Sequence, residues 1–312
     1  MRSGELMVTV LVIALCSMNA APVPPDRCIP ARIERRLSIP STQQALTMPT
    51  DVAVSSEGTV FVADGVHHRI ARFDRLGNIL PAFESGMMDP VGIFADGDDR
   101  LWIADRDAHC VLRLKDDGAI DENIGLPPDH NQPATPTDVA ITRDGSRIFV
   151  VDNTNHRLLV WEKAAGQWNI LGSSGKSLGQ FQYPFMIAMD SQDYVYVTEA
   201  IGARVQSISP ADRWAGQISG FGVELGQVYR PKGVAVDAKN RLFISDSTLG
   251  VIQVFSTQGA LQGVLSDEHR QPLRFDHPMG MCFDARGLLY VVELKANRVA
   301  VVSFAETGDS SR

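Results

Sequence analysis

One short pattern recurs six times along this chain and constrains its fold more than any other feature. Each copy has a proline, a short apolar strand, a turn, a second apolar strand that ends in an acidic residue, and a third strand that opens near an arginine. Successive copies start 41, 46, 48, 47 and 47 residues apart, at Pro49, Pro90, Pro136, Pro184, Pro231 and Pro278. Short strands with turns that repeat at such a spacing are typical of a β-propeller.

The strands of the repeats are apolar on both faces. Residues 101–104 read Leu-Trp-Ile-Ala and residues 242–245 read Leu-Phe-Ile-Ser, without the alternation that a strand with one wet face would have. A single repeat cannot bury both faces of its sheet, so each repeat must stack on its neighbours. The sequence therefore predicts an all-β fold, a six-bladed β-propeller.

A strand from the N-terminal segment is expected to close this ring. Five repeats are followed by a candidate fourth strand, as at 79–83, 168–171 and 260–265, but the sixth is followed by a polar tail. Residues 32–39 have strand character and no other place, so we expect them to complete the sixth blade. The predicted organisation is a signal peptide at 1–21, an N-terminal segment at 22–47, the propeller at 48–304 and the tail at 305–312.

The first residues look like an export signal. Residues 6–15 read LMVTVLVIAL, an apolar core too short to span a bilayer, with small residues at Ala20 and Ala21 for cleavage. We expect a secreted protein, periplasmic or extracellular, with no membrane span after cleavage. The alternatives are a lipoprotein anchored at Cys16 and an uncleaved anchor.

Charge and cysteine content narrow the possible partners. Lys and Arg number 29 against 37 Asp and Glu, so the net charge is −8, which disfavours binding to nucleic acid. After cleavage, Cys28, Cys110 and Cys282 would remain, far apart and odd in number, which is no disulfide framework. Their thiol state stays open. We expect a monomer.

The repeats resemble the NHL repeat, whose pattern combines Pro-x-Gly-Val-Ala-Val-Asp with a strand that ends in Asp and an Asn-x-Arg turn. Residues 231–237 read PKGVAVD and residues 149–158 read FVVDNTNHRL. The resemblance extends over roughly residues 48 to 302, and six copies in register make it specific. It implies a propeller that serves as a binding scaffold for a protein, a peptide or a small ligand.

The first repeat, with Phe61-Val62-Ala63-Asp64-Gly65, also resembles the core of peptidyl-hydroxyglycine amidating lyase. That family holds zinc with histidines that directly follow the repeat prolines. Here those positions hold no histidine but Thr50, Val91, Thr137, Phe185, Lys232 and Met279. Zinc needs three or four converging ligands, so we expect no zinc and no cofactor. Calcium stays open, because Asp51 and Asp138 could approach the axis.

Acidic residues end the second strand of every repeat, at Asp64, Asp105, Asp152, Glu199, Asp246 and Glu293. They could form an acidic ring for a cation, or each could pair with the arginine five residues later. Equivalent positions on neighbouring blades lie on the order of 10 Å apart, so we expect structural pairs. These are Asp64 with Arg69, Asp152 with Arg157, Glu199 with Arg204, and Glu293 with Arg298; the other two repeats have Cys110 and Val251.

Two further patterns have a functional and a structural interpretation. Histidines recur beside the arginine position, at His67, His68, His109 and His156, either as metal ligands or as repeated turn residues. Residues 172–177 read GSSGKS and end like a phosphate-binding loop, but Ile170 stands where its first glycine should be. We expect turn residues in the first case and a loop between blades in the second.

The channel mouth is the remaining candidate site. Residues that follow the prolines and the acids would surround one end of the channel with a mixed polar and apolar rim. The candidate binding residues are Asp51, Asp138, Phe185, Lys232, Met279, Arg106 and Asn153; no catalytic constellation or metal site is identified. We predict a binding scaffold, with a metal-dependent lyase or lactonase of propeller type as the alternative.

Overall fold

The computed structural model describes residues 22–84 and 86–305. The predicted signal peptide, including Cys16, and residues 306–312 of the predicted tail lie outside them. The described chain is all-β apart from two short 3-10 helices, η1 (Pro25–Arg27) and η2 (Gly65–His67). None of the helices in this part of the chain is long and apolar enough to span a membrane.

The strands within the described residues form four sheets of four strands and one of eight. The four-stranded sheets are β2 (Val52–Val54), β3 (Val60–Asp64), β4 (Arg69–Phe73), β5 (Ile79–Phe83); β6 (Pro90–Ala95), β7 (Leu101–Asp105), β8 (Cys110–Leu114), β9 (Ile120–Gly125); β10 (Pro136–Ile141), β11 (Arg147–Asp152), β12 (Arg157–Glu162), β13 (Gln167–Leu171); and β14 (Pro184–Met189), β15 (Val195–Glu199), β16 (Arg204–Ile208), β17 (Trp214–Ile218). The eight-stranded sheet runs in the order β18 (Pro231–Val236), β19 (Arg241–Asp246), β20 (Val251–Ser256), β21 (Leu261–Ser266), β1 (Cys28–Leu37), β24 (Arg298–Phe304), β23 (Leu289–Glu293), β22 (Pro278–Phe283).

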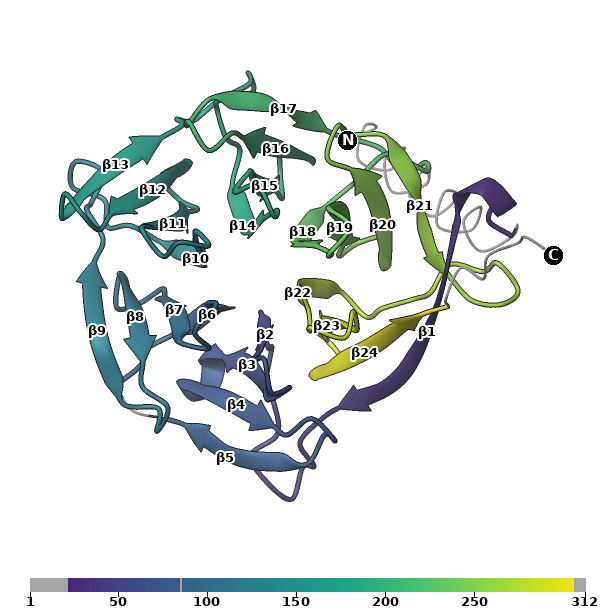
Figure 1. Cartoon of the computed structure of the whole chain (residues 1–312), viewed down its shortest axis with the longest axis horizontal. Coiled ribbons are helices and arrows are strands. Elements are labelled where there is room, and N and C mark those ends of the chain that lie inside the picture. The colour runs from purple at the N-terminus through teal and green to yellow at the C-terminus, as the bar shows by residue number, and fades with distance from the viewer. Residues whose placement is uncertain (1–21, 85, 306–312) are drawn as a thin grey trace, which may run out of the picture.

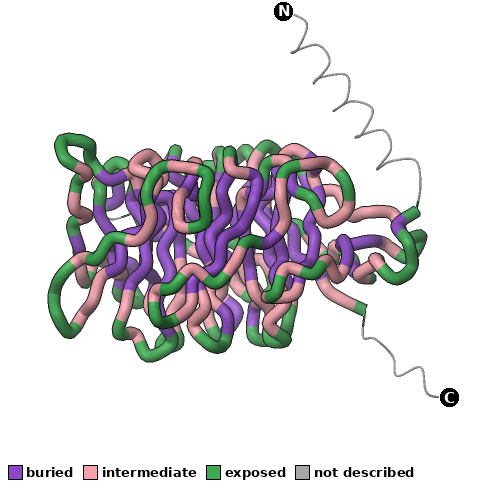
Figure 2. The backbone as a smooth tube through the Cα atoms, turned by 90° about the horizontal axis from the view of Figure 1, so that it is seen from above, coloured by how far each residue is buried: buried purple, intermediate pink, exposed green. Residues whose placement is uncertain are grey.

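The sheets are arranged around a common centre (Figure 1). Strands β2, β6, β10, β14, β18 and β22 lie innermost, and β5, β9, β13 and β17 lie outermost. Each inner strand begins at or just after a proline of the sequence repeat. Proline has no N–H to donate to a neighbouring strand, so it suits the first residue of a strand better than its interior. Figure 2 shows, from the side, that buried residues lie in the middle of the molecule and that exposed residues gather at its edges.

Hydrophobic clusters fill the spaces between neighbouring sheets, which is why the strands are apolar on both faces. Phe61 and Ile70 pack with Ile103 of the next sheet. Val62 packs with Tyr290 of β23, so the first and last repeats also share a core. Equivalent clusters join the other neighbouring sheets.

Strand β1 lies between β21 and β24. Its second half pairs antiparallel with β24, from Ala31 opposite Phe304 to Leu37 opposite Val299. Its first half pairs parallel with β21, where Cys28 lies opposite Val264. The strand starts at Cys28, earlier than the predicted residues 32–39, and ends at Leu37.

The third position of the proline motif controls how closely neighbouring inner strands approach one another. A Cβ on Gly280 would lie 1.9 Å from Oδ1 of Asp51, and one on Gly233 would lie 2.1 Å from the carbonyl oxygen of Met279. Glycine is therefore needed at these two positions for the close approach. The same position holds aspartate in two repeats, Asp51 and Asp138.

Candidate functional site

A cavity of about 190 Å³ lies at the centre of the ring. All six inner strands contribute to its wall, and most of the lining residues have apolar side chains. The lining includes Ile93 and Phe94 from β6, Met186 from β14 and Val234 from β18. Its titratable residues, among those described, are Asp51, Asp138 and Cys282.

Asp51 and Asp138 meet in this cavity although they belong to different sheets. Each is 5% exposed, and their side chains hydrogen-bond to each other. Asp51 accepts hydrogen bonds from the backbone N–H groups of Val52 and Ile93, both at 2.9 Å. The second bond joins the carboxyl group to the inner strand of the next sheet.

Asp138 repeats this arrangement two sheets further on. It accepts hydrogen bonds from the N–H groups of Val139 at 2.8 Å and Ile187 at 2.9 Å. The strand edges that face the channel have free N–H groups, and the two aspartates satisfy four of them. This explains in physical terms why acids are tolerated so deep in the ring.

Burial raises the pKa of both carboxyl groups. The pKa of Asp51 rises to about 7, partly offset by the bonds from Ile93 and Val52 and by the hydrogen bond with Asp138. The pKa of Asp138 rises well above its usual range, because of burial and then the charge of Asp51. The hydrogen bond between the two carboxyl groups needs one proton, and the directions of the two shifts favour the arrangement in which Asp138 donates it to Asp51. A pair of this kind can hold, donate or accept a proton.

The thiol of Cys282, a half-buried residue on β22, lies in the same lining. Burial raises the pKa of Cys282 well above its usual range, and the charges of Asp51 and Asp284 raise it further. The thiol is therefore a neutral wall group near neutral pH.

Phe185 and Lys232 form a second pair among the predicted mouth residues. The Lys232 Nζ lies 3.4 Å from the centre of the Phe185 ring, a cation–π contact. Burial, followed by the charge of Arg230, lowers the pKa of Lys232 to about 8. The Lys232 ammonium group therefore lies against an aromatic ring, where a carboxylate would be the more usual partner.

The other three predicted mouth residues have contacts of their own. Met279 is buried in the cluster that joins the first and last repeats. Arg106 forms an ion pair with Asp89, and the side-chain amide of Asn153 donates to the carbonyl oxygen of Pro184 at 2.6 Å. Asp51 and Asp138 are the two predicted binding residues in the cavity lining.

The acid–arginine pairs lie in contact within their own sheets. The arginine Nε donates to the acid at 2.9 Å in Arg69–Asp64, 2.8 Å in Arg157–Asp152, 2.5 Å in Arg204–Glu199 and 2.6 Å in Arg298–Glu293. The acids also accept N–H bonds from the loop that leads into the same sheet, as from Thr135 to Asp152. Cys110, where the second repeat has no arginine, is buried, and burial raises its pKa to about 11.

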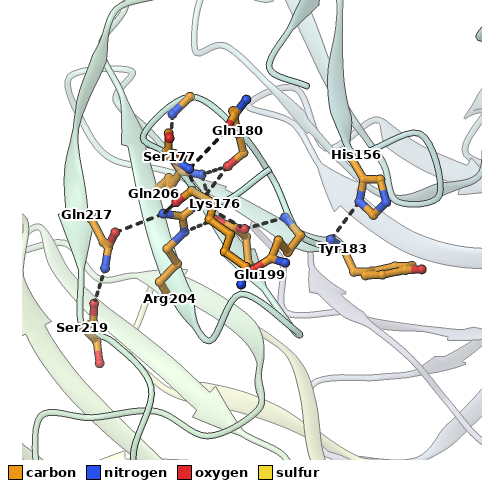
Figure 3. A network of polar contacts seen from close by, with 12 residues as sticks. His156, Lys176, Ser177, Gln180, Tyr183, Glu199, Arg204, Gln206, Gln217 and Ser219 are labelled. Carbon is orange, nitrogen blue, oxygen red and sulfur yellow. Dashed lines mark hydrogen bonds and ion pairs between the residues drawn. The ribbon is translucent and has the colours of Figure 1, made fainter. Parts of the chain in front are cut away.

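The Glu199 pair extends into a larger network (Figure 3). Arg204 donates to the carbonyl oxygens of Lys176 at 2.7 Å and Gln180 at 2.8 Å, and Gln206 bridges Gln180 and Glu199. These contacts hold the segment 172–177, which lies in the loop between β13 and β14. In this segment the backbone carbonyl oxygen of Lys176 accepts a hydrogen bond from Arg204. A phosphate-binding loop instead directs its backbone N–H groups toward the bound anion.

The recurring histidines occupy turn positions on separate sheets. His68, His109 and His156 have positive φ angles of 53°, 51° and 55°. His68 and His109 reach carbonyl oxygens of the following loop, at Met88 and Ala134. His67 contacts Asp64. Among the described residues, no group of three or more His, Cys, Asp and Glu residues is placed to hold a metal ion.

Sequence reasoning did not foresee Cys282 in the cavity lining, nor the contact between the two aspartates. The available clue was the third position of the proline motif. Three repeats have glycine at this position, namely Gly92, Gly233 and Gly280. The other three repeats have Asp51, Asp138 and Met186 there. A side chain that replaces a motif glycine next to the axis must project into the channel or its wall.

Comparisons with known proteins agree with this architecture. The NHL repeat model matches residues 46–73. Virginiamycin B lyase from Staphylococcus aureus is 15% identical over 91% of this chain and 98% of its own, with a TM-score of 0.61. A gluconolactonase from Xanthomonas campestris is 14% identical over 92% and 99%, with a TM-score of 0.66.

An auxiliary nutrient binding protein from Bacteroides thetaiotaomicron is also similar in structure. It is 12% identical over 88% of this chain and 74% of its own, with a TM-score of 0.64. The same architecture thus occurs in enzymes and in a binding protein, so the likeness establishes the fold and leaves the activity to the site. The chain carries an NHL repeat over residues 46–73 and has the fold of an NHL-type β-propeller.

Proposed function

We propose that the chain is an exported six-bladed propeller, closed by β1, that binds a small ligand or a side chain of a partner peptide in its central cavity. The observation that carries this proposal is a central cavity lined mainly by residues with apolar side chains, with a buried carboxyl pair among them. In this organisation residues 22–47 precede a single propeller at 48–304, and the protein works as a monomer.

The size and chemistry of the cavity favour a small ligand with a hydrogen-bond donor. At about 190 Å³ it is below the size of pockets for drug-sized molecules. Asp51 and Asp138 take part in no ion pair among the described residues, so an ionised Asp51 has no cation beside it. A short apolar amine, free or as a lysine side chain, would supply both the missing charge and the apolar contact.

Titration calorimetry with short alkylamines and their matching alcohols tests this proposal. We expect the amines to bind and the alcohols to bind less tightly, and Asp51→Asn to weaken amine binding at least about tenfold, the loss of one charge-assisted bond. Asp116→Asn, which alters an exposed acid, is the matched control. Equal binding of amines by the Asp51→Asn variant would contradict the proposal.

The carboxyl pair also favours a second candidate, an enzyme of the lyase or lactonase type. A protonated and an ionised carboxyl group side by side are suited to general acid–base chemistry. Two of the similar structures are a virginiamycin B lyase and a gluconolactonase by name. Here, too, Asp51 and Asp138 would be the reacting groups, with calcium as the metal that their oxygen atoms suit.

Assays on the mature protein separate the two candidates. For a binding protein we expect no turnover of virginiamycin B, a gluconolactone or a peptidyl-hydroxyglycine, with zinc or calcium added. Chelator-sensitive turnover that Asp138→Asn abolishes would establish the enzyme. Calcium that only raises the melting temperature would leave the binding proposal standing. N-terminal sequencing of exported protein tests the predicted start near residue 22.

A further inference from the structure

The carboxyl pair joins four consecutive sheets across the channel. Asp51, the residue before β2, accepts a hydrogen bond from Ile93 of β6, and Asp138, on β10, accepts one from Ile187 of β14. The hydrogen bond between the two carboxyl groups connects these two links. We propose that Asp51 and Asp138 form a proton-operated clasp, which holds these four blades together while Asp138 carries its proton and loosens when that proton leaves.

The surroundings give the pair no other charge to rely on. Strand β22 presents the neutral thiol of Cys282, and Asp284 lies beyond it. Strands β6, β14 and β18 present apolar groups, such as Phe94, Met186 and Val234. Lys232, also on β18, directs its Nζ to the Phe185 ring. The charged residues near the pair are therefore acids, apart from a lysine that is engaged elsewhere.

Two ionised carboxylates at this position would repel each other with little screening, since both are buried. The backbone N–H bonds stabilise a carboxylate but do not neutralise it. In the ligand-free protein this repulsion favours movement of the pair apart, and each member would then pull on the inner strand of the following blade. The raised pKa values of Asp51 and Asp138 are consistent with a proton that the closed pair holds tightly.

The clasp does not depend on ligand binding, so its test uses ligand-free protein. The amide signals of Ile93 and Ile187 report the ionisation of Asp51 and Asp138, because each N–H donates to one of these carboxyl groups. In the native protein we expect the Ile93 signal to titrate first and the Ile187 signal at higher pH. In Asp51→Asn the midpoint of Ile187 should fall by about one pH unit or more, since the like charge is gone.

Asp116→Asn is the control and should leave both midpoints unchanged. An Ile187 midpoint that does not move in Asp51→Asn, or signals of Ile93 and Ile187 that do not titrate in the native protein, would overturn the proposal. The second outcome needs no variant, so the test holds even if Asp51→Asn fails to fold.

Access to Cys282 measures the loosening itself, because its thiol lies in the same cavity. Thiol ionisation alone makes alkylation about tenfold faster per pH unit below the thiol pKa. In the native protein we expect the alkylation rate of Cys282 to increase more than tenfold per pH unit above neutral pH. In Asp138→Asn it should increase only the tenfold that thiol ionisation explains, because the asparagine amide has no acidic proton to lose. Equal slopes in both proteins would contradict the clasp. Failure of amine binding would leave these results unaffected.

Discussion

His156 accepts a hydrogen bond at Nδ1 from the backbone N–H of Tyr183, 3.0 Å away, and the two rings meet edge to face (Figure 3). The contact joins the β10–β13 blade to the loop before the next inner strand. Asn297 occupies the equivalent turn position in the last repeat, where its Oδ1 accepts from the N–H of Met48 at 2.8 Å. Both residues have a positive φ, 55° and 51°.

The comparison with Asn297 predicts which substitution of His156 the fold tolerates. His156→Asn should keep both the acceptor and the positive φ, which asparagine adopts readily. His156→Ala should lose the acceptor and strain the backbone, at a cost of about 1–3 kcal/mol in the free energy of unfolding. Urea denaturation of both variants measures the difference; equal midpoints would show that the bond to Tyr183 adds no stability.

Arg157 is predicted to matter more for stability than Arg298. The Arg157 side chain is 5% exposed and its partner Asp152 is fully buried, whereas Arg298 is 34% exposed. Arg157→Ala should cost about 3–5 kcal/mol, because it leaves the buried Asp152 carboxylate without its positively charged partner. Arg298→Ala should cost less, since Arg36 still pairs with Glu293 at 3.2 Å. Chemical denaturation of both variants measures the two losses in the free energy of unfolding. A larger loss for Arg298→Ala than for Arg157→Ala would contradict the prediction.

The repeat made the sheets and the core predictable from the sequence. A proline before each inner strand and an acid at the end of the next strand fix where strands start and stop, and apolar residues on both faces require stacked neighbours. The first residues of β1 were not foreseen. Residues 28–30 include Pro30, which weakens the strand pattern, and they pair with β21 of another repeat.

The site was predictable only in part. Asp51 and Asp138 stood out as acids near the axis, but their contact depends on how closely the blades approach, and that distance is set by tertiary packing. The histidines were predicted as turn residues, as the structure has them, but the contacts of their rings were not. Whether a ring nitrogen donates, as in His109, or accepts, as in His156, depends on the loop of the neighbouring blade.

Strand β1 offers a matched pair of substitutions that test the closing strand. Leu37 is 3% exposed and packs in the cluster shared by the first and last repeats, whereas the Arg32 side chain is 77% exposed. Leu37→Ala should lower the free energy of unfolding by about 2–5 kcal/mol. Arg32→Ala should change it by less than about 0.5 kcal/mol. A Leu37→Ala variant that melts like the native protein would contradict a structural role for β1.

The pKa of Asp51 predicts how stability changes with pH. Its pKa is about 7 in the folded protein, above the usual aspartate value, so the folded state binds this proton more tightly than the unfolded state does. The resulting stabilisation is complete at acid pH, below the unfolded pKa, and is lost as the pH rises through about 7, at up to about 1.4 kcal/mol per pH unit. Asp51→Asn should remove this loss, so its stability relative to the native protein should improve between about pH 4 and pH 7 and level off above that. Urea denaturation across that range measures the difference, with Asp116→Asn as the control that should follow the native protein. A constant difference between Asp51→Asn and the native protein at every pH would mean that Asp51 ionises as easily in the ring as in the unfolded chain.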